Sequence, residues 1–280
     1  MQLASEPRSM RLSDLGELGL LEELESRGLA QGIEHDAAEL PGGRVVTQDT
    51  LVEGVHFTPA WTTFRALGYR AAAVNLSDLA ASGAEPEGLI VSLGAPPETA
   101  VEDVLELYVG LNEPGVPVLG GDTTASQRLF LTVTALGRSA RVPGRAGARP
   151  GDLLVVTGPL GAAAVAFRNE QHSRPPLRLD EGRQLGAVAD AMIDISDGLA
   201  RDAGHLARRS GCRLVIELER VPRVSGATVE DLGFGEDHEL LAASPDRPGF
   251  PEIGRCVEGE GVELLFDGEP VELGGWEHFT

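Results

Sequence analysis

The spacing of apolar residues predicts alternating strands and helices in the first half of the chain. Apolar residues recur at helical spacing from Phe64 to Ser82 and again through residues 98–115. Shorter β-branched or apolar runs, bounded by Gly, Pro and polar turns, predict strands at residues 44–50, 88–96, 116–124 and 129–137. This alternation is typical of an α/β fold.

The second half of the chain repeats this kind of pattern after an irregular segment. Residues 137–152 are rich in Arg, Gly and Pro and lack apolar periodicity, so we expect a domain boundary there. Beyond it we predict helices from Gly161 and over 198–210, and strands at residues 152–158, 191–196, 212–218, 238–244, 252–259 and 262–268. We therefore predict two α/β domains, residues 1–138 and 139–280.

The charge of the chain narrows the possible partners. It has 280 residues and a formal net charge of -21, and all 23 basic residues are arginine. Without lysine there is no P-loop, Schiff-base or kinase β3 lysine. Strong acidity without a basic stripe argues against nucleic acid as a partner. If the protein binds phosphates, it must use metal ions, arginines and backbone amides.

Cysteine usage and hydropathy indicate a cytoplasmic protein. The two cysteines, Cys212 and Cys256, lack CxxC spacing, which excludes a zinc ribbon and suits a reducing compartment. The N-terminal residues are polar and acidic, unlike a signal or transit peptide. The longest apolar stretch is too short and too often interrupted to span a membrane, so we expect no membrane partner.

Several carboxylates occur where strands end or helices begin. Asp49 and Asp122 follow the apolar parts of two predicted strands, and Asp194 and Asp197 lie at a strand–helix junction. Asp78 shares one face of a predicted helix with other polar residues. This spacing fits a solvated helix face as well as a functional site. Carboxylates gathered without lysines repel one another unless cations lie between them, and such hard oxygen ligands suit magnesium.

Other polar and aromatic positions are candidates for ligand contacts. Arg145 lies in the irregular segment and is a candidate phosphate clamp, because a guanidinium binds phosphate oxygens in a bidentate way. Glu236 follows a glycine-rich loop, and Trp276 could either anchor the chain end or stack on a flat ligand. Asp202, one turn into a predicted helix, is expected to be a solvated surface residue.

Six motifs in order resemble those of the thiamine-monophosphate kinases, a family in the aminoimidazole-ribotide-synthetase-like superfamily. They are "TQDTLVEGVHF", "AVNLSDLAASGAEP", "LGGDTT", "RAGARPGD", "IDISDGL" and "GEDHEL", with a further match at "GGWEHF". The resemblance implies a two-domain α/β (α+β) fold that forms a homodimer through a β-barrel interface of N-terminal strands. It also implies ATP-dependent phosphorylation of thiamine monophosphate to thiamine diphosphate with release of ADP, assisted by several Mg²⁺ ions.

Carried over position by position, the resemblance also implies roles for individual residues. The implied magnesium ligands are Asp36, Asp49, Asp78, Asp122, Asp194 and Asp197. The implied ATP contacts are Gly121, Asp122, Arg145 and Ser196. The implied thiamine-phosphate contacts are His56, Glu236 and Trp276. No separate catalytic base is implied, because the acceptor is already an anionic phosphate oxygen near neutral pH.

The chain departs from the family pattern at several positions. The usual "GIGDDA" is "GIEHDA" here, so Glu34 and His35 replace a glycine and an aspartate, while Gln48 and His238 replace a hydroxyl and an aromatic residue. These changes leave open the number of metal ions and the range of acceptors. Two related activities, aminoimidazole ribonucleotide synthesis and selenophosphate synthesis, would be expected to use a lysine that this chain lacks. A non-catalytic or drifted nucleotide-binding paralogue remains the alternative.

Overall fold

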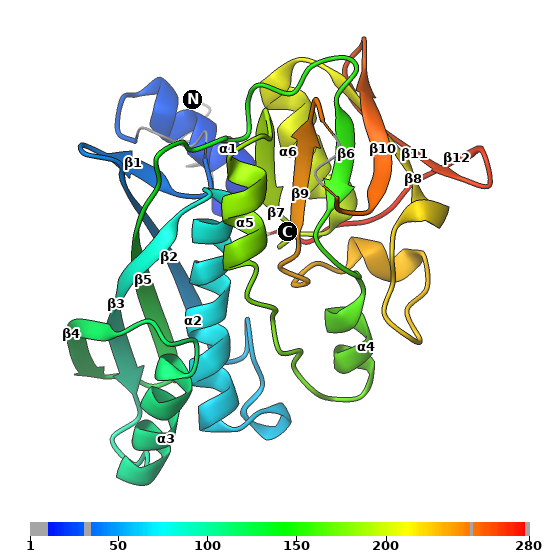
Figure 1. Cartoon of the computed structure of the whole chain (residues 1–280). Helices are drawn as coiled ribbons and strands as arrows, with labels where there is room; N and C mark the ends of the chain where they lie inside the picture. The colour runs from blue at the N-terminus through cyan, green and yellow to red at the C-terminus, as the bar shows by residue number, and fades with distance from the viewer. Residues whose placement is uncertain (1–10, 31–34, 247–248, 278–280) are drawn as a thin grey trace, which may run out of the picture.

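Two mixed β-sheets lie side by side, with a long central helix between them (Figure 1). The computed structural model describes residues 11–30, 35–246 and 249–277. The elements up to the end of the first sheet are α1 (Leu12–Ser26), β1 (Ala38–Leu40), β2 (Arg44–Val52), α2 (Phe64–Ala81), β3 (Glu85–Ala95), α3 (Val101–Asn112), β4 (Val118–Ala125) and β5 (Phe130–Arg138). The first sheet has the order β1-β2-β5-β3-β4, in which only β3 and β4 are parallel.

The second sheet is built from the C-terminal half of the chain. Its elements are β6 (Leu153–Val156), α4 (Ala162–Arg168), α5 (Leu179–Gly186), β7 (Ala191–Asp194), α6 (Leu199–Ser210), β8 (Arg213–Glu217), β9 (Leu240–Ser244), β10 (Glu252–Val257), β11 (Gly261–Phe266) and β12 (Glu269–Val271). The order is β12-β11-β8-β10-β6-β9-β7, with β8 and β11 parallel. The predicted domain boundary after residue 138 falls in the connection between the two sheets.

Helix α2 is buried on nearly every side, unlike an amphipathic surface helix. Asn75 in this helix and Ser82, its C-cap, are almost inaccessible, so a solvated polar face is the wrong interpretation of their spacing. Helix α3 packs closely against it because both helices carry glycine at the contact. A Cβ on Gly68 would lie 1.9 Å from the carbonyl oxygen of Leu107, and one on Gly110 would meet the main chain of α2 equally closely.

Three apolar clusters hold the layers together. One lies between the first sheet, α2 and α3, and a second lies between the second sheet and α6. The third, which includes Ala80, Leu185, Met192 and Leu240, joins the end of α2 to α5 and the second sheet. The two sheets are therefore packed against a shared helix, and this fixes the position of side chains that extend from α2 toward the C-terminal half.

Most of the predicted strands and helices are present, with differences at their ends. β2 and β4 continue past Asp49 and Asp122, because β5 and β3 pair with them along their whole length. The pattern did not predict α1, β1, α5 or β12. β1, α5 and β12 are short, and α1 is exposed and interrupted by the non-helical Gly16.

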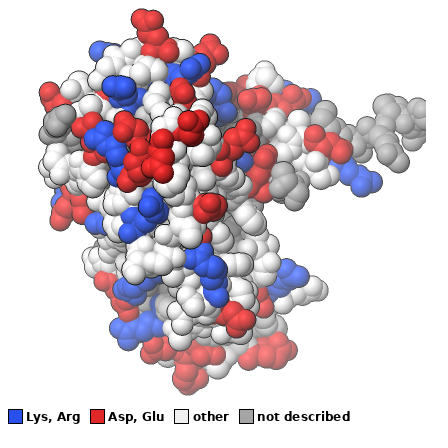
Figure 2. Space-filling view, turned by 90° about the vertical axis from the view of Figure 1, so that its right-hand side faces the viewer, with Lys and Arg blue, Asp and Glu red and all other residues white. Residues whose placement is uncertain are grey.

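The surface carries both signs of charge. Figure 2 shows arginine side chains interspersed with carboxylates over one face of the molecule. Exposed pairs such as Arg138 with Glu87 contribute little to stability because water screens them. No helix in the described ranges combines the length and apolar character needed to cross a membrane. The cytoplasmic location expected from the sequence stays a prediction.

Candidate active site

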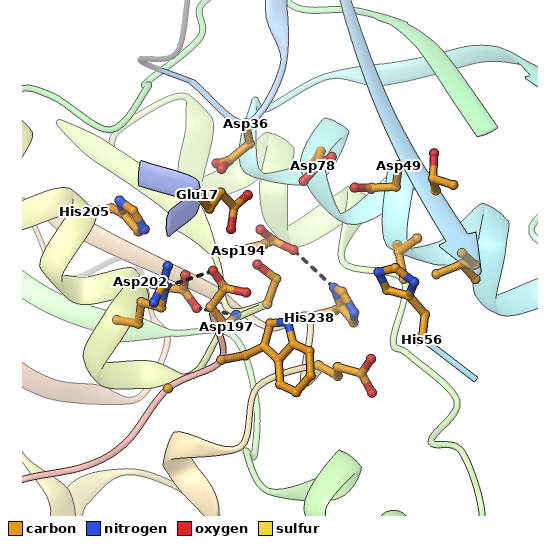
Figure 3. A pocket seen from close by; sticks show the side chains of 18 of the residues that line it. Glu17, Asp36, Asp49, His56, Asp78, Asp194, Asp197, Asp202, His205 and His238 are labelled. Carbon is orange, nitrogen blue, oxygen red and sulfur yellow. Dashed lines mark hydrogen bonds and ion pairs between the residues drawn. The ribbon is translucent and has the colours of Figure 1, made fainter. Parts of the chain in front are cut away.

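A cavity of about 1090 Å³ opens between the two halves of the molecule. Helices α1, α2 and α6, strand β2 and the C-terminal segment contribute to its walls (Figure 3). Ten of the twelve residues to which the resemblance assigned a role line it: Asp36, Asp49, His56, Asp78, Arg145, Asp194, Ser196, Asp197, Glu236 and Trp276. The cavity therefore brings together residues that are up to 240 positions apart in the sequence.

A cluster of carboxylates forms the middle of the cavity. Oxygen atoms of Asp36, Asp78 and Asp194 lie within 4.8 Å of one another, and Asp49 extends toward the same place from β2 (Figure 3). The Thr47 hydroxyl donates to Asp78 Oδ2 at 2.5 Å. Asp36 lies in a loop, Asp49 on β2, Asp78 on α2 and Asp194 at the end of β7. The rigid elements around the cluster therefore determine the spacing of its carboxylates.

Hydrogen bonds from neighbouring side chains orient the carboxylates. The Ser77 hydroxyl donates to Asp194 Oδ2 at 2.6 Å, and Asn75 Oδ1 accepts from the backbone N–H of Asp49 at 3.0 Å. Arg145 donates twice to Asp36 Oδ1, at 3.1 and 2.5 Å, which leaves Oδ2 of that carboxylate for another partner. The polar residues of α2 thus act as supports for the cluster.

Burial and mutual repulsion shift the pKa of these carboxyls. Burial raises the pKa of Asp36 from 3.8 to about 6, although Arg145 opposes the shift. Burial and the neighbouring carboxylates raise the pKa of Asp49 to about 6 and hold that of Asp78 well above its usual range. A cation between the carboxylates would relieve both the desolvation and the repulsion. The donor set is all oxygen and suits Mg²⁺ better than a soft metal.

His238 contacts the same cluster from the other side. Its Nδ1 lies 3.2 Å from Asp194 Oδ2, and the ring is buried. Burial alone would lower the pKa of His238, but hydrogen bonding and attraction to Asp194 outweigh it and raise the pKa above its usual value. His238, which stands where the family pattern has an aromatic residue, therefore supports the Asp194 carboxylate.

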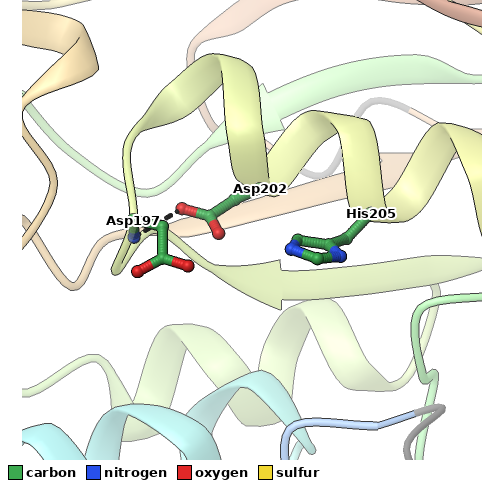
Figure 4. Close-up of side chains that lie close together, drawn as sticks. All are labelled: Asp197, Asp202 and His205. Atoms are coloured by element: carbon green, nitrogen blue, oxygen red, sulfur yellow. Dashed lines mark hydrogen bonds between the residues drawn. The ribbon is translucent and has the colours of Figure 1, made fainter. Parts of the chain in front are cut away.

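Asp202 is buried, which contradicts the expectation of a solvated residue. Its side chain points back along α6, and Oδ2 accepts from the backbone N–H groups of Asp197 and Gly198 at 3.0 and 3.1 Å (Figure 4). Burial and the nearby carboxylates hold the pKa of Asp202 well above its usual range. The two amide donors account for its burial, and they fix the turn that carries Ser196 and Asp197.

A second group of possible ligands adjoins this turn. Side-chain atoms of Asp197, Asp202 and His205 lie within 4.8 Å of one another (Figure 4). The Arg208 guanidinium lies 3.0 Å from His205 Nδ1 and can only donate, so Nδ1 accepts and a neutral ring carries its proton on Nε2. Burial and the surrounding arginines lower the pKa of His205 to about 4, which keeps it neutral. This tautomer does not ligate a metal through Nε2.

One end of the cavity is lined by loops with unusual backbone conformations. Glu236 and His238 have φ values of 58° and 52°, in the left-handed region that non-glycine residues rarely adopt. The backbone N–H of Glu236 donates to the carbonyl of Ser196 at 2.7 Å. A Cβ on Gly235 would lie 2.5 Å from that same carbonyl oxygen, so only glycine allows the loop to pack so closely.

Aromatic side chains form the wall at this end. Trp61 meets Phe167 edge to face with ring centroids 5.3 Å apart, and Phe167 packs against Phe234 at 5.2 Å. Trp276 is half exposed, and its backbone N–H donates to the carbonyl of Asp197 at 2.9 Å. His56 also lines the cavity (Figure 3). This end suits a flat, partly apolar ligand.

Two predicted site residues lie elsewhere. Gly121 and Asp122 are exposed on β4, an edge strand of the first sheet, and neither lines the cavity. Glu34, one of the departures from the family pattern, lies outside the described residues. The structure therefore brings five of the six proposed metal ligands to one cavity within this chain, and leaves Asp122 apart from them.

Sequence reasoning missed several residues that line the cavity, namely Glu17, Trp61, Arg70, Phe167, His172, His205 and Phe234. The motifs gave no signal for the aromatic residues Trp61, Phe167 and Phe234, because all three lie outside them. For the burial of Asp202 a signal existed: it lies three residues after Leu199 and four before Leu206, so helical spacing places it on the same face of α6 as these apolar residues.

Comparison with known proteins places this geometry in context. Residues 34–139 match the family model described as AIR synthase related protein, N-terminal domain. The thiamine-monophosphate kinase of Aquifex aeolicus is 34% identical over 96% of this chain and 100% of its own length, and that of Synechococcus elongatus is 37% identical over 96% and 98%. A solved structure, AaThiL complexed with AMPPCP and TMP, superposes with a TM-score of 0.89 at 34% identity and covers 97% of this chain and 100% of its own.

Proposed function

The chain belongs to the thiamine-monophosphate kinase family, and from this premise we propose that it phosphorylates thiamine monophosphate with ATP, releasing thiamine diphosphate and ADP. The observation that carries the proposal is the cavity itself, in which a carboxylate cluster lies beside an aromatic end that suits a flat ligand. The structural relative with 34% identity was solved with AMPPCP and TMP. The proposal therefore assigns the carboxylates to the phosphates and the aromatic end to the thiamine moiety.

Magnesium fits the carboxylates that this chain supplies. Asp36, Asp49, Asp78 and Asp194 are the proposed ligands in the middle of the cavity, and Asp197 is proposed at its edge. Buried carboxyls with raised pKa values indicate negative charge that the chain alone does not neutralise. Mg²⁺ would supply positive charge that neutralises the phosphates of both reactants.

The remaining side chains bind and align the reactants. Arg145 retains donors beyond those used on Asp36 and is proposed to hold a phosphate of ATP, together with Ser196. His56, Glu236 and Trp276 are proposed to hold thiamine monophosphate at the aromatic end. The acceptor phosphate oxygen is already anionic, so alignment and charge neutralisation perform the work that a general base performs elsewhere.

A direct assay tests the function. Purified protein with ATP, thiamine monophosphate and Mg²⁺ is expected to form thiamine diphosphate and ADP in equal amounts, and chelation of Mg²⁺ is expected to stop the reaction. A panel of other phosphorylated acceptors measures its specificity. Binding of ATP without product from any acceptor would instead support the non-catalytic paralogue, for which the altered "GIEHDA" segment is the supporting feature.

We further propose that two copies of the chain associate through the first sheet. Its face away from α2 includes Ile90 and Leu119, which are 40% and 60% exposed, and β4 ends the sheet as an edge strand. In such a homodimer, Gly121 and Asp122 of one protomer can contact the nucleotide at its partner's cavity. If so, mixing and reassociating inactive Asp78→Asn and Asp122→Asn proteins restores roughly a quarter of wild-type activity, because half of the dimers regain one intact site. Mixtures that stay inactive after exchange contradict this arrangement.

A further inference from the structure

Arg70 is a buried arginine at the aromatic end of the cavity, and neither the motifs nor the family resemblance assigned it a role. It lies near the middle of α2 and is 3% exposed. It also lines the cavity, close to two of the residues proposed to hold thiamine monophosphate. Because α2 is buried on nearly every side, the base of this side chain is held rigidly.

One guanidinium contacts three separate segments. Nη1 donates to the carbonyl oxygen of His56 at 2.7 Å, in the loop between β2 and α2. Nη2 forms an ion pair with Glu236 Oε1, in the loop before β9. The ring of His172, in the connection between α4 and α5, lies 3.3 Å from Nη1. The fork of a guanidinium allows these contacts at the same time, which a single ammonium group cannot reproduce.

The contact with His172 is steric rather than a hydrogen bond. His172 Nε2 accepts from the backbone N–H of Thr58 at 3.0 Å, so the neutral ring carries its proton on Nδ1. That proton faces the Arg70 donor. Burial and the charge of Arg70 lower the pKa of His172, which keeps the ring neutral. His172 therefore packs beside the guanidinium and limits where it can move, while Trp61 packs against the ring with centroids 5.9 Å apart.

Stability alone is a weak reason for this arrangement. The ion pair with Glu236 contributes little net stability, because burial desolvates the Arg70 guanidinium while the Glu236 side chain is 37% exposed and its charge is screened by water. Arg70 Nε is also buried and has no hydrogen-bond partner among the described residues, which adds a further cost. The gain must therefore be positional. Glu236 has a left-handed backbone, and its carboxylate accepts from Arg70 through Oε1, which leaves Oε2 for a ligand.

We propose that Arg70 is a positioning residue of the acceptor pocket, which orients the Glu236 carboxylate and fixes the His56 loop so that both can bind thiamine monophosphate. The role rests on the proposed function, because it concerns the acceptor of that reaction. Among the described residues, Arg70 forms no hydrogen bond or ion pair with the carboxylates of the metal cluster or with Arg145. Its influence should therefore fall on the acceptor and spare ATP.

The test compares Arg70→Met, Arg70→Lys and a matched control. Arg174→Met is the control, since Arg174 belongs to the same region, stacks on the Tyr69 ring at 3.3 Å, pairs with Glu113 and does not line the cavity. Arg70→Met is expected to raise KM for thiamine monophosphate about tenfold or more, with KM for ATP changed less than about twofold. Arg70→Lys, which keeps the charge but loses the fork, is expected to fall between Met and wild type. The control is expected to match wild type.

A double variant tests whether Arg70 acts through Glu236. Glu236→Gln alone should raise KM for thiamine monophosphate, and adding Arg70→Met should raise it by less than the product of the two single effects. Titration calorimetry with thiamine monophosphate in the absence of ATP should show the same loss of affinity. If Arg70→Met fails to fold, the KM values and the calorimetry of Arg70→Lys show whether Arg70 affects thiamine monophosphate binding.

Each outcome decides for or against the role. KM and Kd for thiamine monophosphate within about twofold of wild type in Arg70→Met would overturn it. Equal increases in KM for both substrates would also overturn it, because they indicate general disruption. Fully multiplicative effects of the two substitutions would show that Arg70 does not act through Glu236. If the wild-type protein neither binds nor phosphorylates thiamine monophosphate, the proposed function and this role are refuted together. If the wild type turns over normally and Arg70→Met is unaffected, this role alone is refuted.

Discussion

Removing divalent metal is expected to destabilise the protein increasingly as the pH rises. Burial and neighbouring carboxylates raise the pKa of Asp36 and of Asp49 from 3.8 to about 6. A group whose pKa is higher in the folded than in the unfolded state stabilises the fold most below the unfolded value. That contribution is lost as the pH rises from about 4 through about 6. Mg²⁺ binds the ionised form, so it should restore stability where the metal-free protein has lost it.

The shift sets the size of the effect. About two pKa units correspond to about 3 kcal/mol for one such carboxylate, and roughly half of this loss falls between pH 5 and pH 7. The contributions of Asp36 and Asp49 do not add, because each ionised carboxylate opposes ionisation of the next. His205 acts in the opposite direction. Its pKa is lowered to about 4 when folded, so the stability it contributes is lost as the pH falls below about 6.5.

Differences between matched samples separate these contributions. Urea unfolding is measured from about pH 5 to pH 8, with EDTA or with Mg²⁺, for wild type and Asp36→Asn. The stability gained from Mg²⁺ should increase with pH in wild type. In EDTA, the stability of Asp36→Asn relative to wild type should rise by about 1 kcal/mol between pH 5 and pH 7. His205 is present in both proteins and cancels in this comparison. A gain from Mg²⁺ that does not change with pH, or a relative stability that falls, would refute the reasoning.

Substitutions at three further positions, with a control at Gly204, test the fold and the site. Gly68→Ala should lower the free energy of unfolding by about 3 kcal/mol, because the added methyl group would overlap the main chain at Leu107. The control Gly204→Ala lies on α6 with open space around it, so it should be neutral or stabilising by less than about 1 kcal/mol. Asp202→Ala should cost about 2 kcal/mol in urea unfolding because two buried amides lose their acceptor, whereas Asp202→Asn keeps an acceptor and should cost less than half as much. Asp78→Asn should lower kcat in the coupled ADP assay at least about a hundredfold while the protein stays folded, because it removes a proposed ligand together with a buried charge.

Specific results would contradict these expectations. Equal stability of the two glycine variants would mean that α2 and α3 are not in close contact. Equal costs for the two Asp202 variants would mean that its charge, rather than its acceptor, fixes the turn. Near-normal turnover of Asp78→Asn would remove it from the metal site.

The local pattern predicted most of the fold because local physics determines it. The helical spacing of α2 and α3 and the short apolar runs of β2, β3 and β5 each reflect a repeat that the backbone imposes. Pairing between distant segments leaves no such repeat. The family resemblance, rather than periodicity, indicated that Asp36 and Asp194 belong to one site, and the structure brings them together across the two halves of the chain.

The predictions failed where polarity was taken as a sign of exposure. Asp202 was expected at the surface because an isolated carboxylate is costly to bury, but two backbone amides offset that cost. Asn75 fitted a solvated helix face equally well, yet its side chain supports Asp49 inside the protein, and the neighbouring Ser77 hydroxyl supports Asp194. In each case the partner is provided by a turn or a distant strand, and a helical pattern carries no information about it.

The absence of lysine has a structural meaning beyond the exclusion of lysine chemistry. Three partly or fully buried arginines each hold a carboxylate contributed by another segment: Arg145 holds Asp36, Arg70 holds Glu236, and Arg178 holds Glu239 through two nitrogens. Each pair joins elements far apart in sequence, and two of the three, those of Arg145 and Arg70, lie in the cavity. A guanidinium fixes both the distance and the orientation of its partner, whereas an ammonium fixes mainly the distance. The geometry of the cavity therefore depends on arginine forks, and conservative Arg→Lys changes at Arg70 or Arg145 should affect function more than stability.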